Sequence, residues 1–161
     1  LKALPLLAGE YLNLTAMKLN YIHIVRFPKG TLRLTSAEQA KELQDAAAYV
    51  SSHTHEGEPI FVFHYSPLLY MLMNRPNPTS YNILIPGYNT TVQVSDAVRD
   101  LQRVRPRVVL QDNFTEFFRK NWRLFYPLAD RSSFENDPIQ AFVSKEYRMV
   151  QSGFISIYAL Q

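Results

Sequence analysis

Residues 20–27, Asn-Tyr-Ile-His-Ile-Val-Arg-Phe, alternate between apolar and polar side chains and include β-branched residues. This pattern predicts a strand. A continuous apolar run follows at residues 60–65, bounded by Pro59 and Pro67, and is typical of a central strand buried on both faces. Three more strands are predicted at residues 107–111, 147–151 and 154–160, the last two joined as an antiparallel hairpin.

Helical spacing of apolar residues appears between these predicted strands. Thr35 and Glu38 have the spacing of a capping box, and apolar residues recur after them at helical intervals, which predicts a helix over residues 36–52. Shorter helices are predicted to begin at Ser66, Ser95, Asn113 and Asp137.

Strands separated by helices favour βαβ units around a mostly parallel sheet. We therefore predict a single α/β domain over residues 1–161, with residues 1–20 forming an arm or linker. The predicted architecture is a Rossmann-like three-layer domain, with helices on both faces of the sheet and the C-terminal antiparallel hairpin at its edge.

Composition supports one compact domain and excludes several classes of site. The chain has 161 residues, 47% of them hydrophobic, and no cysteine, which excludes disulfides, zinc ribbons, iron–sulfur clusters and thiol nucleophiles. The net charge of +3 is small, and we predict no nucleic-acid partner.

Basic residues gather near one predicted connection from a helix to a strand: Arg99, Arg103, Arg105 and Arg107. The ordinary interpretation is a solvated surface. The alternative is a surface that faces anionic lipid headgroups.

The sequence lacks the motifs of the common catalytic sites. Its five glycines are far apart, so neither a dinucleotide-binding turn nor a P-loop is present, and no nucleophile elbow is found. His53, His55 and Glu56 lie close in sequence, but histidines two apart on a helix do not share a face. We predict no metal site, no cofactor and no catalytic residue in this chain.

The segment that follows the predicted central strand is dense in polar and ring-bearing side chains. Arginine offers a planar fork for phosphate, amides and hydroxyls offer paired donors and acceptors, and tyrosine offers a ring face for a sugar. The predicted ligand-binding residues are Tyr65, Tyr70, Arg75, Asn77, Thr79 and Tyr81, with Arg75 as the anion contact. The alternative is a structured loop in which asparagine and proline form turns and Arg75 binds carbonyl groups.

The same segment carries a resemblance to a known family. Its sequence is PIFVFHYSPLLYMLMNRPNPTSYN, with a strand that ends near tyrosine and proline, a leucine-rich turn, and an Arg-x-Asn-Pro-Thr block from Arg75 to Thr79. It resembles the soluble domain after the last membrane helix of bacterial proteins of the dolichyl-phosphate-mannose protein mannosyltransferase type, which are polyprenyl-phosphate-dependent glycosyltransferases. The resemblance covers about residues 27–160 and departs at His64, where the family has proline or another small residue.

The resemblance implies a non-catalytic domain on the extracytoplasmic face of a bacterial membrane, within a multi-pass glycosyltransferase-like protein. Its expected role is to cover the active site or to bind an acceptor or a lipid-phosphate headgroup. The catalytic aspartates of that family lie in its membrane portion, so the expected partners are the membrane portion of the same parent chain and a polyprenyl-phosphate headgroup or glycan. Because the sequence begins with leucine, we expect a fragment whose natural start lies upstream. Two alternatives stay open, a stand-alone Rossmann-like transferase with a phosphate site that lacks glycines and a structural docking module.

Overall fold

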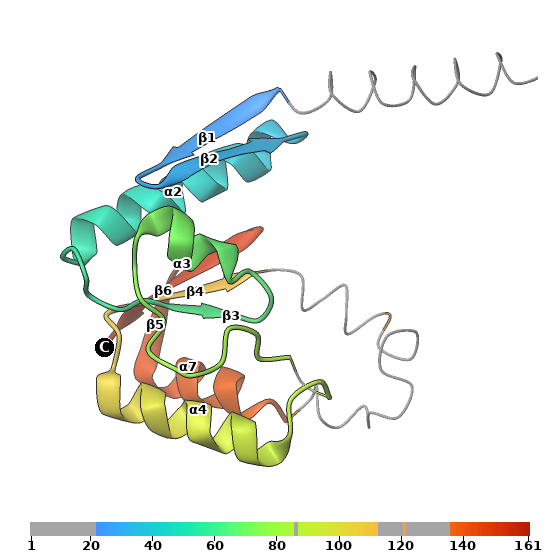
Figure 1. Cartoon of the computed structure of the whole chain (residues 1–161), viewed down its shortest axis with the longest axis vertical. Coiled ribbons are helices and arrows are strands. Elements are labelled where there is room, and N and C mark those ends of the chain that lie inside the picture. The colour runs from blue at the N-terminus through green and yellow to red at the C-terminus, as the bar shows by residue number, and fades with distance from the viewer. Residues whose placement is uncertain (1–21, 86, 113–120, 122–135) are drawn as a thin grey trace, which may run out of the picture.

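The computed structural model describes residues 22–85, 87–112, 121 and 136–161 (Figure 1). In this part of the chain a sheet of four strands, in the order β3-β4-β6-β5, accompanies a separate sheet of two, β1 and β2. The strands are β1 (His23–Phe27), β2 (Gly30–Leu34), β3 (Phe61–Phe63), β4 (Val108–Asp112), β5 (Tyr147–Gln151) and β6 (Ile155–Leu160).

The larger sheet is mixed. β3 and β4 are parallel, whereas β4 pairs with β6 and β5 pairs with β6 in antiparallel orientation. Only one of its three pairings is parallel, so the prediction of a Rossmann-like three-layer domain with a mostly parallel sheet is wrong. The physical reason lies in helix α7 (Pro138–Glu146), which continues directly into β5 at Tyr147. The tight β5–β6 hairpin then returns the chain beside β4 in the opposite direction, so no crossover produces a further parallel strand.

Each face of the larger sheet packs against helices. Helices α2 (Ala37–His53) and α3 (Leu68–Met73) contribute to one apolar cluster, with Val62 and Leu110 from the sheet. Helix α4 (Thr91–Val104) and α7 contribute to a second cluster, which includes Phe61 and Phe63. Alternate residues of β3 thus point to opposite faces, which explains its continuous apolar sequence.

β3 is a fully buried strand, but it lies at the edge of the sheet and not in its centre. The connection between α3 and α4 covers its outer side, where Ile60 N donates to Pro76 O and Leu84 N donates to His64 O. This protection allows a wholly apolar strand to occupy an edge position.

The first strand pairs within a local hairpin that the sequence analysis did not predict. β1 and β2 are antiparallel partners joined by the turn at Pro28 and Lys29, and Val25 and Phe27 face the core that includes α2. The backbone N–H of Lys29 donates to Leu72 O at 3.2 Å, which attaches the turn to α3.

The observed helix positions agree with those predicted from the sequence more closely than the observed strand pairing does. Helix α2 starts after Ser36, whose hydroxyl accepts a hydrogen bond from Gln39 N, close to the predicted range of 36–52. Helix α4 starts four residues before the predicted cap at Ser95. The helix predicted to begin at Asn113 and the arm predicted over residues 1–20 lie outside the described residues. Within the described ranges, no helix combines the length and apolar character needed to cross a bilayer.

Candidate functional site

The carboxyl ends of the parallel strands β3 and β4 bring polar residues together. His64 follows β3 directly and is 2% exposed, and its Nε2 lies 2.9 Å from Asp137 Oδ2. Beside it, the backbone N–H of Tyr65 donates to Asp112 Oδ2, at the end of β4, over 2.8 Å. Strand ends of this kind are common ligand positions in α/β sheets.

These contacts tie three elements together. Asp137 is the N-cap of α7, and its second carboxylate oxygen accepts a hydrogen bond from Ile139 N at 2.9 Å. The carboxylate therefore holds the start of α7 against the end of β3 through His64. Asp137 also borders a hollow of about 270 Å³ between the start of α4 and α7. Asp137 thus caps α7 and binds His64 at the same time.

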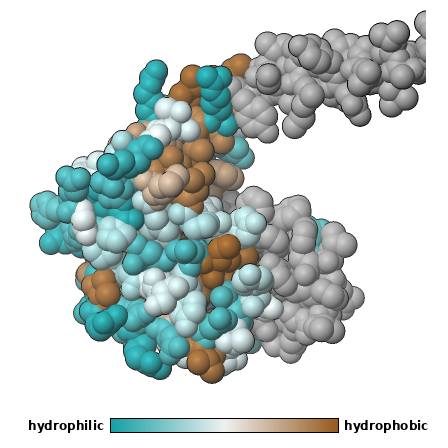
Figure 2. All heavy atoms as spheres, viewed as in Figure 1, coloured by the Kyte–Doolittle hydropathy of each residue, from teal (hydrophilic) through white to brown (hydrophobic). Residues whose placement is uncertain are grey.

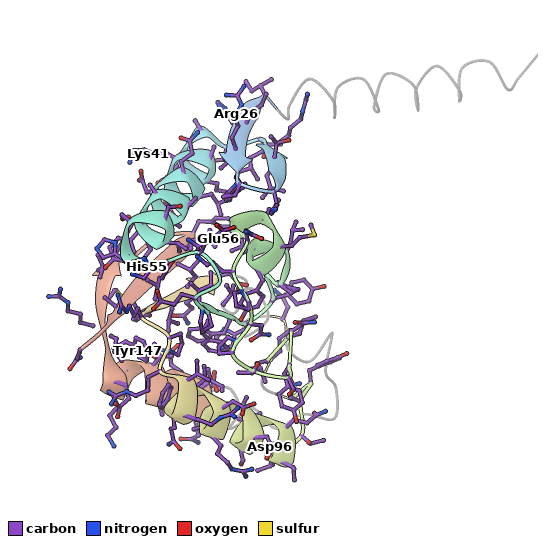
Figure 3. The ribbon with its side chains drawn as sticks, turned by 60° about the vertical axis from the view of Figure 1, so that its left-hand side comes forward. Arg26, Lys41, His55, Glu56, Asp96 and Tyr147 are labelled. Atoms are coloured by element: carbon purple, nitrogen blue, oxygen red, sulfur yellow. The ribbon has the colours of Figure 1, made fainter. Side chains whose placement is uncertain are left out.

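A larger hollow of about 830 Å³ lies where the β1–β2 turn, the end of α2, and α3 with the chain after it converge. We call it the polar hollow. Its polar side chains are Lys29, Glu56, Asn74, Arg75, Asn77 and Asn82, and Tyr70, Met71, Pro67 and Pro76 add apolar surface. The hollow is a shallow depression that is widely open to solvent. Glu56, labelled in Figure 3, lies beside α3 on the side of the molecule that this view brings forward.

One side of the polar hollow is held by a contact between two elements. Asn74 Nδ2 donates to Glu56 Oε1 at 3.2 Å, linking the end of α3 to the loop after α2. Asn74 ends α3 in the left-handed conformation, with φ at 53°, which asparagine tolerates better than most residues. Amide and carboxylate groups therefore stand together at this side of the hollow.

Arg75 lines the polar hollow, but most of its donors bind the protein itself. Its Nε donates to Thr54 Oγ1 at 2.9 Å, and its terminal nitrogens lie 3.1 to 3.4 Å from the carbonyl oxygens of Thr54, Met73 and Asn74. The guanidinium thus joins the end of α2 to the end of α3. Its positive charge remains beside the hollow, whereas its hydrogen-bonding capacity is largely used by the fold.

The Asn77, Thr79 and Tyr81 block folds on itself. Asn77 Oδ1 accepts from Thr79 N at 2.9 Å, and Asn77 Nδ2 donates to Tyr81 O at 2.9 Å. This is the hydrogen bonding of an asparagine turn. Asn77 also lines the polar hollow, whereas Thr79 does not, and the Tyr81 hydroxyl reaches Asp96 of α4 at 3.4 Å.

The two remaining predicted residues lie in different surroundings. Tyr70 is buried, and its hydroxyl accepts from Val62 N at 2.7 Å and donates to Val62 O at 3.1 Å on β3. Burial raises the pKa of this hydroxyl above its ordinary value, and the bond to Val62 opposes that shift. Tyr65 is 43% exposed at the strand ends and is not among the residues that line the polar hollow. Of the six predicted residues, the structure therefore places Tyr70, Arg75 and Asn77 at one hollow.

Lys29 is the residue that the sequence analysis missed. Lys29 is exposed and lines the polar hollow, and its side chain has no hydrogen bond or ion pair with any described residue. The signal that could have identified it is the Pro-Lys-Gly sequence between two alternating stretches, which is typical of a hairpin turn.

The described residues contain no group of three or more histidine, aspartate or glutamate side chains arranged to hold a metal ion. In the predicted His53, His55 and Glu56 cluster, the His53 ring stacks on Tyr49 with centroids 3.8 Å apart. Its Nδ1 lies 2.9 Å from Tyr49 O. Comparisons with protein-family models, curated proteins and solved structures found no match to this chain.

Proposed function

We propose that this chain is a non-catalytic extracytoplasmic domain of a multi-pass, glycosyltransferase-like membrane protein, and that it binds a lipid-phosphate headgroup or a glycan in the polar hollow. The binding role rests on one observation. Lys29, whose side chain has no ion pair with a described residue, lines a hollow of about 830 Å³ together with Arg75 and several amides. The resemblance of residues 59–82 to the mannosyltransferase-type domains supports the class proposed for the parent protein and its proposed location at the membrane.

The hollow offers groups for both parts of a phosphorylated sugar or prenyl headgroup, because cationic and amide side chains stand beside a surface that is mostly apolar. Lys29 is a compact point charge with three donors that can turn toward a phosphate. Glu56 and Asn82 can accept or donate bonds to sugar hydroxyls, and Met71 and Pro76 provide apolar surface for the ring. A site exposed to water on one side typically gives weak binding, so we expect dissociation constants in the millimolar range or just below.

The contacts of Arg75 change the assignment of the anion contact. Its guanidinium has four hydrogen bonds to Thr54, Met73 and Asn74, which leaves it little freedom to turn toward a ligand. Lys29 has no such restriction. We therefore propose Lys29 as the direct phosphate contact and Arg75 as a fixed positive charge behind it.

The location of binding can be tested by following the backbone amide signals of isotope-labelled protein during titration. The probes are mannose, mannose 1-phosphate, farnesyl phosphate and inorganic phosphate. We expect saturable shifts at Lys29, Glu56, Gly57 and residues 74–77, largest for the probes that carry both phosphate and sugar or prenyl groups. Signals of α7, on the opposite face of the sheet, serve as the internal control.

Two outcomes would overturn the proposal. One is the absence of saturable shifts around the polar hollow with every probe at millimolar concentration, which would favour the structural docking module. The other is binding confined to the strand ends near His64 and Asp137. The stand-alone Rossmann-like transferase is not carried forward, because the larger sheet is mixed.

A further inference from the structure

The outer face of the β1–β2 hairpin carries two arginines. Arg33 lies opposite Ile24 and Arg26 opposite Thr31, so these four side chains share the face directed away from Val25 and Phe27. Arg26 and Arg33 are both exposed, and neither has a hydrogen bond or ion pair with any residue in the described part of the chain. Figure 3 shows Arg26 at the end of the molecule, pointing outward.

Four of the other five exposed arginines of the described chain form ion pairs, whereas Arg148 on β5 has none with a described residue. On α4, Arg99 binds Asp96 at 3.1 Å and Arg103 binds Asp100 at 2.7 Å. In the same way, Arg105 binds Glu146 at 3.2 Å and Arg107 binds Glu58 at 3.0 Å. The basic cluster of residues 99–107 is therefore largely neutralised. The described hairpin contains no acidic residue, and its positive charge stays uncompensated there.

Exposed aliphatic side chains lie beside these cations. Ile24 is 41% exposed and lies on the face that bears Arg26 and Arg33, and Ile22, which directly precedes β1, is 66% exposed. Figure 2 shows apolar and hydrophilic side chains next to one another at this end of the molecule. An antiparallel pair brings opposite side chains to about 5 Å, so Ile24 and Arg33 form one contact surface.

We propose that this hairpin face docks on a membrane surface that carries anionic lipid headgroups. Unpaired arginines complement lipid phosphates, and neighbouring isoleucines can enter the boundary between headgroups and acyl chains. A nucleic-acid backbone would use the arginines but not the isoleucines, and the face offers no aromatic ring for a base. This inference concerns a surface separate from the polar hollow and does not depend on ligand binding there.

The test measures cosedimentation of the whole chain with vesicles of phosphatidylglycerol and phosphatidylcholine, and with vesicles of phosphatidylcholine alone. We expect binding to the anionic vesicles that weakens as salt is raised. Each arginine contributes about a fivefold change in affinity, so R26Q/R33Q should bind about 25-fold more weakly. The matched control R99Q/R103Q removes the same charge from paired positions and should lose less than about fivefold.

The apolar half of the proposal has its own variant, I22T/I24T, which keeps β-branched side chains on the strand and should weaken vesicle binding by about fivefold or more. Thermal unfolding confirms that each variant is folded.

The proposal is overturned if anionic vesicles bind no better than neutral ones, if both arginine pairs cause equal losses, or if I22T/I24T binds like the unchanged chain. Tighter binding to duplex DNA at the same salt, or self-association abolished by R26Q/R33Q, would also overturn it. Binding of mannose 1-phosphate should be unaffected in R26Q/R33Q, which separates this test from that of the polar hollow.

Discussion

Two buried tyrosines differ in the hydrogen bonding of their hydroxyl groups. The Tyr70 hydroxyl bonds both backbone groups of Val62 and thereby satisfies the outer side of the edge strand β3. The Tyr147 hydroxyl is buried and finds no hydrogen-bond partner within the described residues. Burial, opposed by Arg105 and assisted by Glu146, raises the pKa of Tyr147 to about 12.

Replacement by phenylalanine should therefore change the free energy of unfolding differently at the two tyrosines. Tyr70→Phe leaves the N–H and carbonyl of Val62 without their partner and should lower the free energy of unfolding by about 1–3 kcal/mol. Tyr147→Phe removes a buried hydroxyl that has no partner and should change stability by less than about 0.5 kcal/mol or increase it. Urea denaturation of both variants measures the difference. Equal losses would show that the hydroxyl contacts do not determine the cost.

The candidate residues show what a sequence can and cannot reveal about a site. Tyr70, Arg75 and Asn77 were predicted as binding residues and all line the polar hollow, although a ligand role for them stays a prediction. The alternative given from the sequence, in which Arg75 binds carbonyl groups, agrees with its bonds to the nearby Met73 and Asn74. Its bonds to Thr54 could not be predicted from local sequence, because Thr54 is 21 positions away. Lys29 was missed because its role depends on the hairpin turn contacting α3, which is a tertiary contact.

At the scale of elements, the starts of α2 and α7 were predicted to within about a residue, whereas the start of α4 was not. Helix α4 begins after Thr90, whose hydroxyl accepts from Gln93 N at 3.3 Å while Gln93 Oε1 accepts from Thr90 N at 2.9 Å. This capping box precedes Ser95, which the sequence analysis chose as the cap. Ser95 instead lies on the exposed surface inside the helix.

The capping assignment predicts which of the two hydroxyl groups matters for stability. Thr90→Ala should lower the free energy of unfolding by about 1 kcal/mol, because Gln93 N loses its acceptor. Ser95→Ala should be neutral or stabilising by up to about 0.5 kcal/mol, because alanine favours the helix interior. Thermal denaturation of the two variants compares them directly. A larger loss from Ser95→Ala would contradict the observed start of α4.

Strand positions were predicted better than strand partners. The strands predicted at residues 60–65, 107–111 and 154–160 each overlap an observed strand, since short-range patterning determines where a strand forms. Pairing depends on contacts between distant residues, which no local pattern specifies. The hairpin of β1 and β2 was missed because its turn, Pro28 and Lys29, lacks the Asn-Gly or Asp-Gly sequence that marks such turns most clearly.

At the scale of the whole molecule, the β1–β2 hairpin connects the two proposed surfaces. Its turn attaches to α3 through Lys29 N and Leu72 O, and Lys29 is among the residues that line the polar hollow. Its outer face carries Arg26 and Arg33, which we propose face a membrane. A headgroup held in the hollow would then be bound near the lipid surface, which is consistent with the proposed role in a membrane glycosyltransferase-like protein.

The most direct test of the account compares dissociation constants for mannose 1-phosphate, measured by isothermal titration calorimetry, between the unchanged chain, Lys29→Gln and Arg99→Gln. Arg99 is an exposed cation on α4, away from the residues that line the polar hollow, so its variant controls for the loss of net charge. Loss of the Lys29 charge should weaken binding about fivefold or more, while Arg99→Gln should stay within about twofold and mannose binding should be unchanged in both. An equal affinity of Lys29→Gln and the unchanged chain for mannose 1-phosphate would contradict the assignment of the polar hollow as a headgroup site.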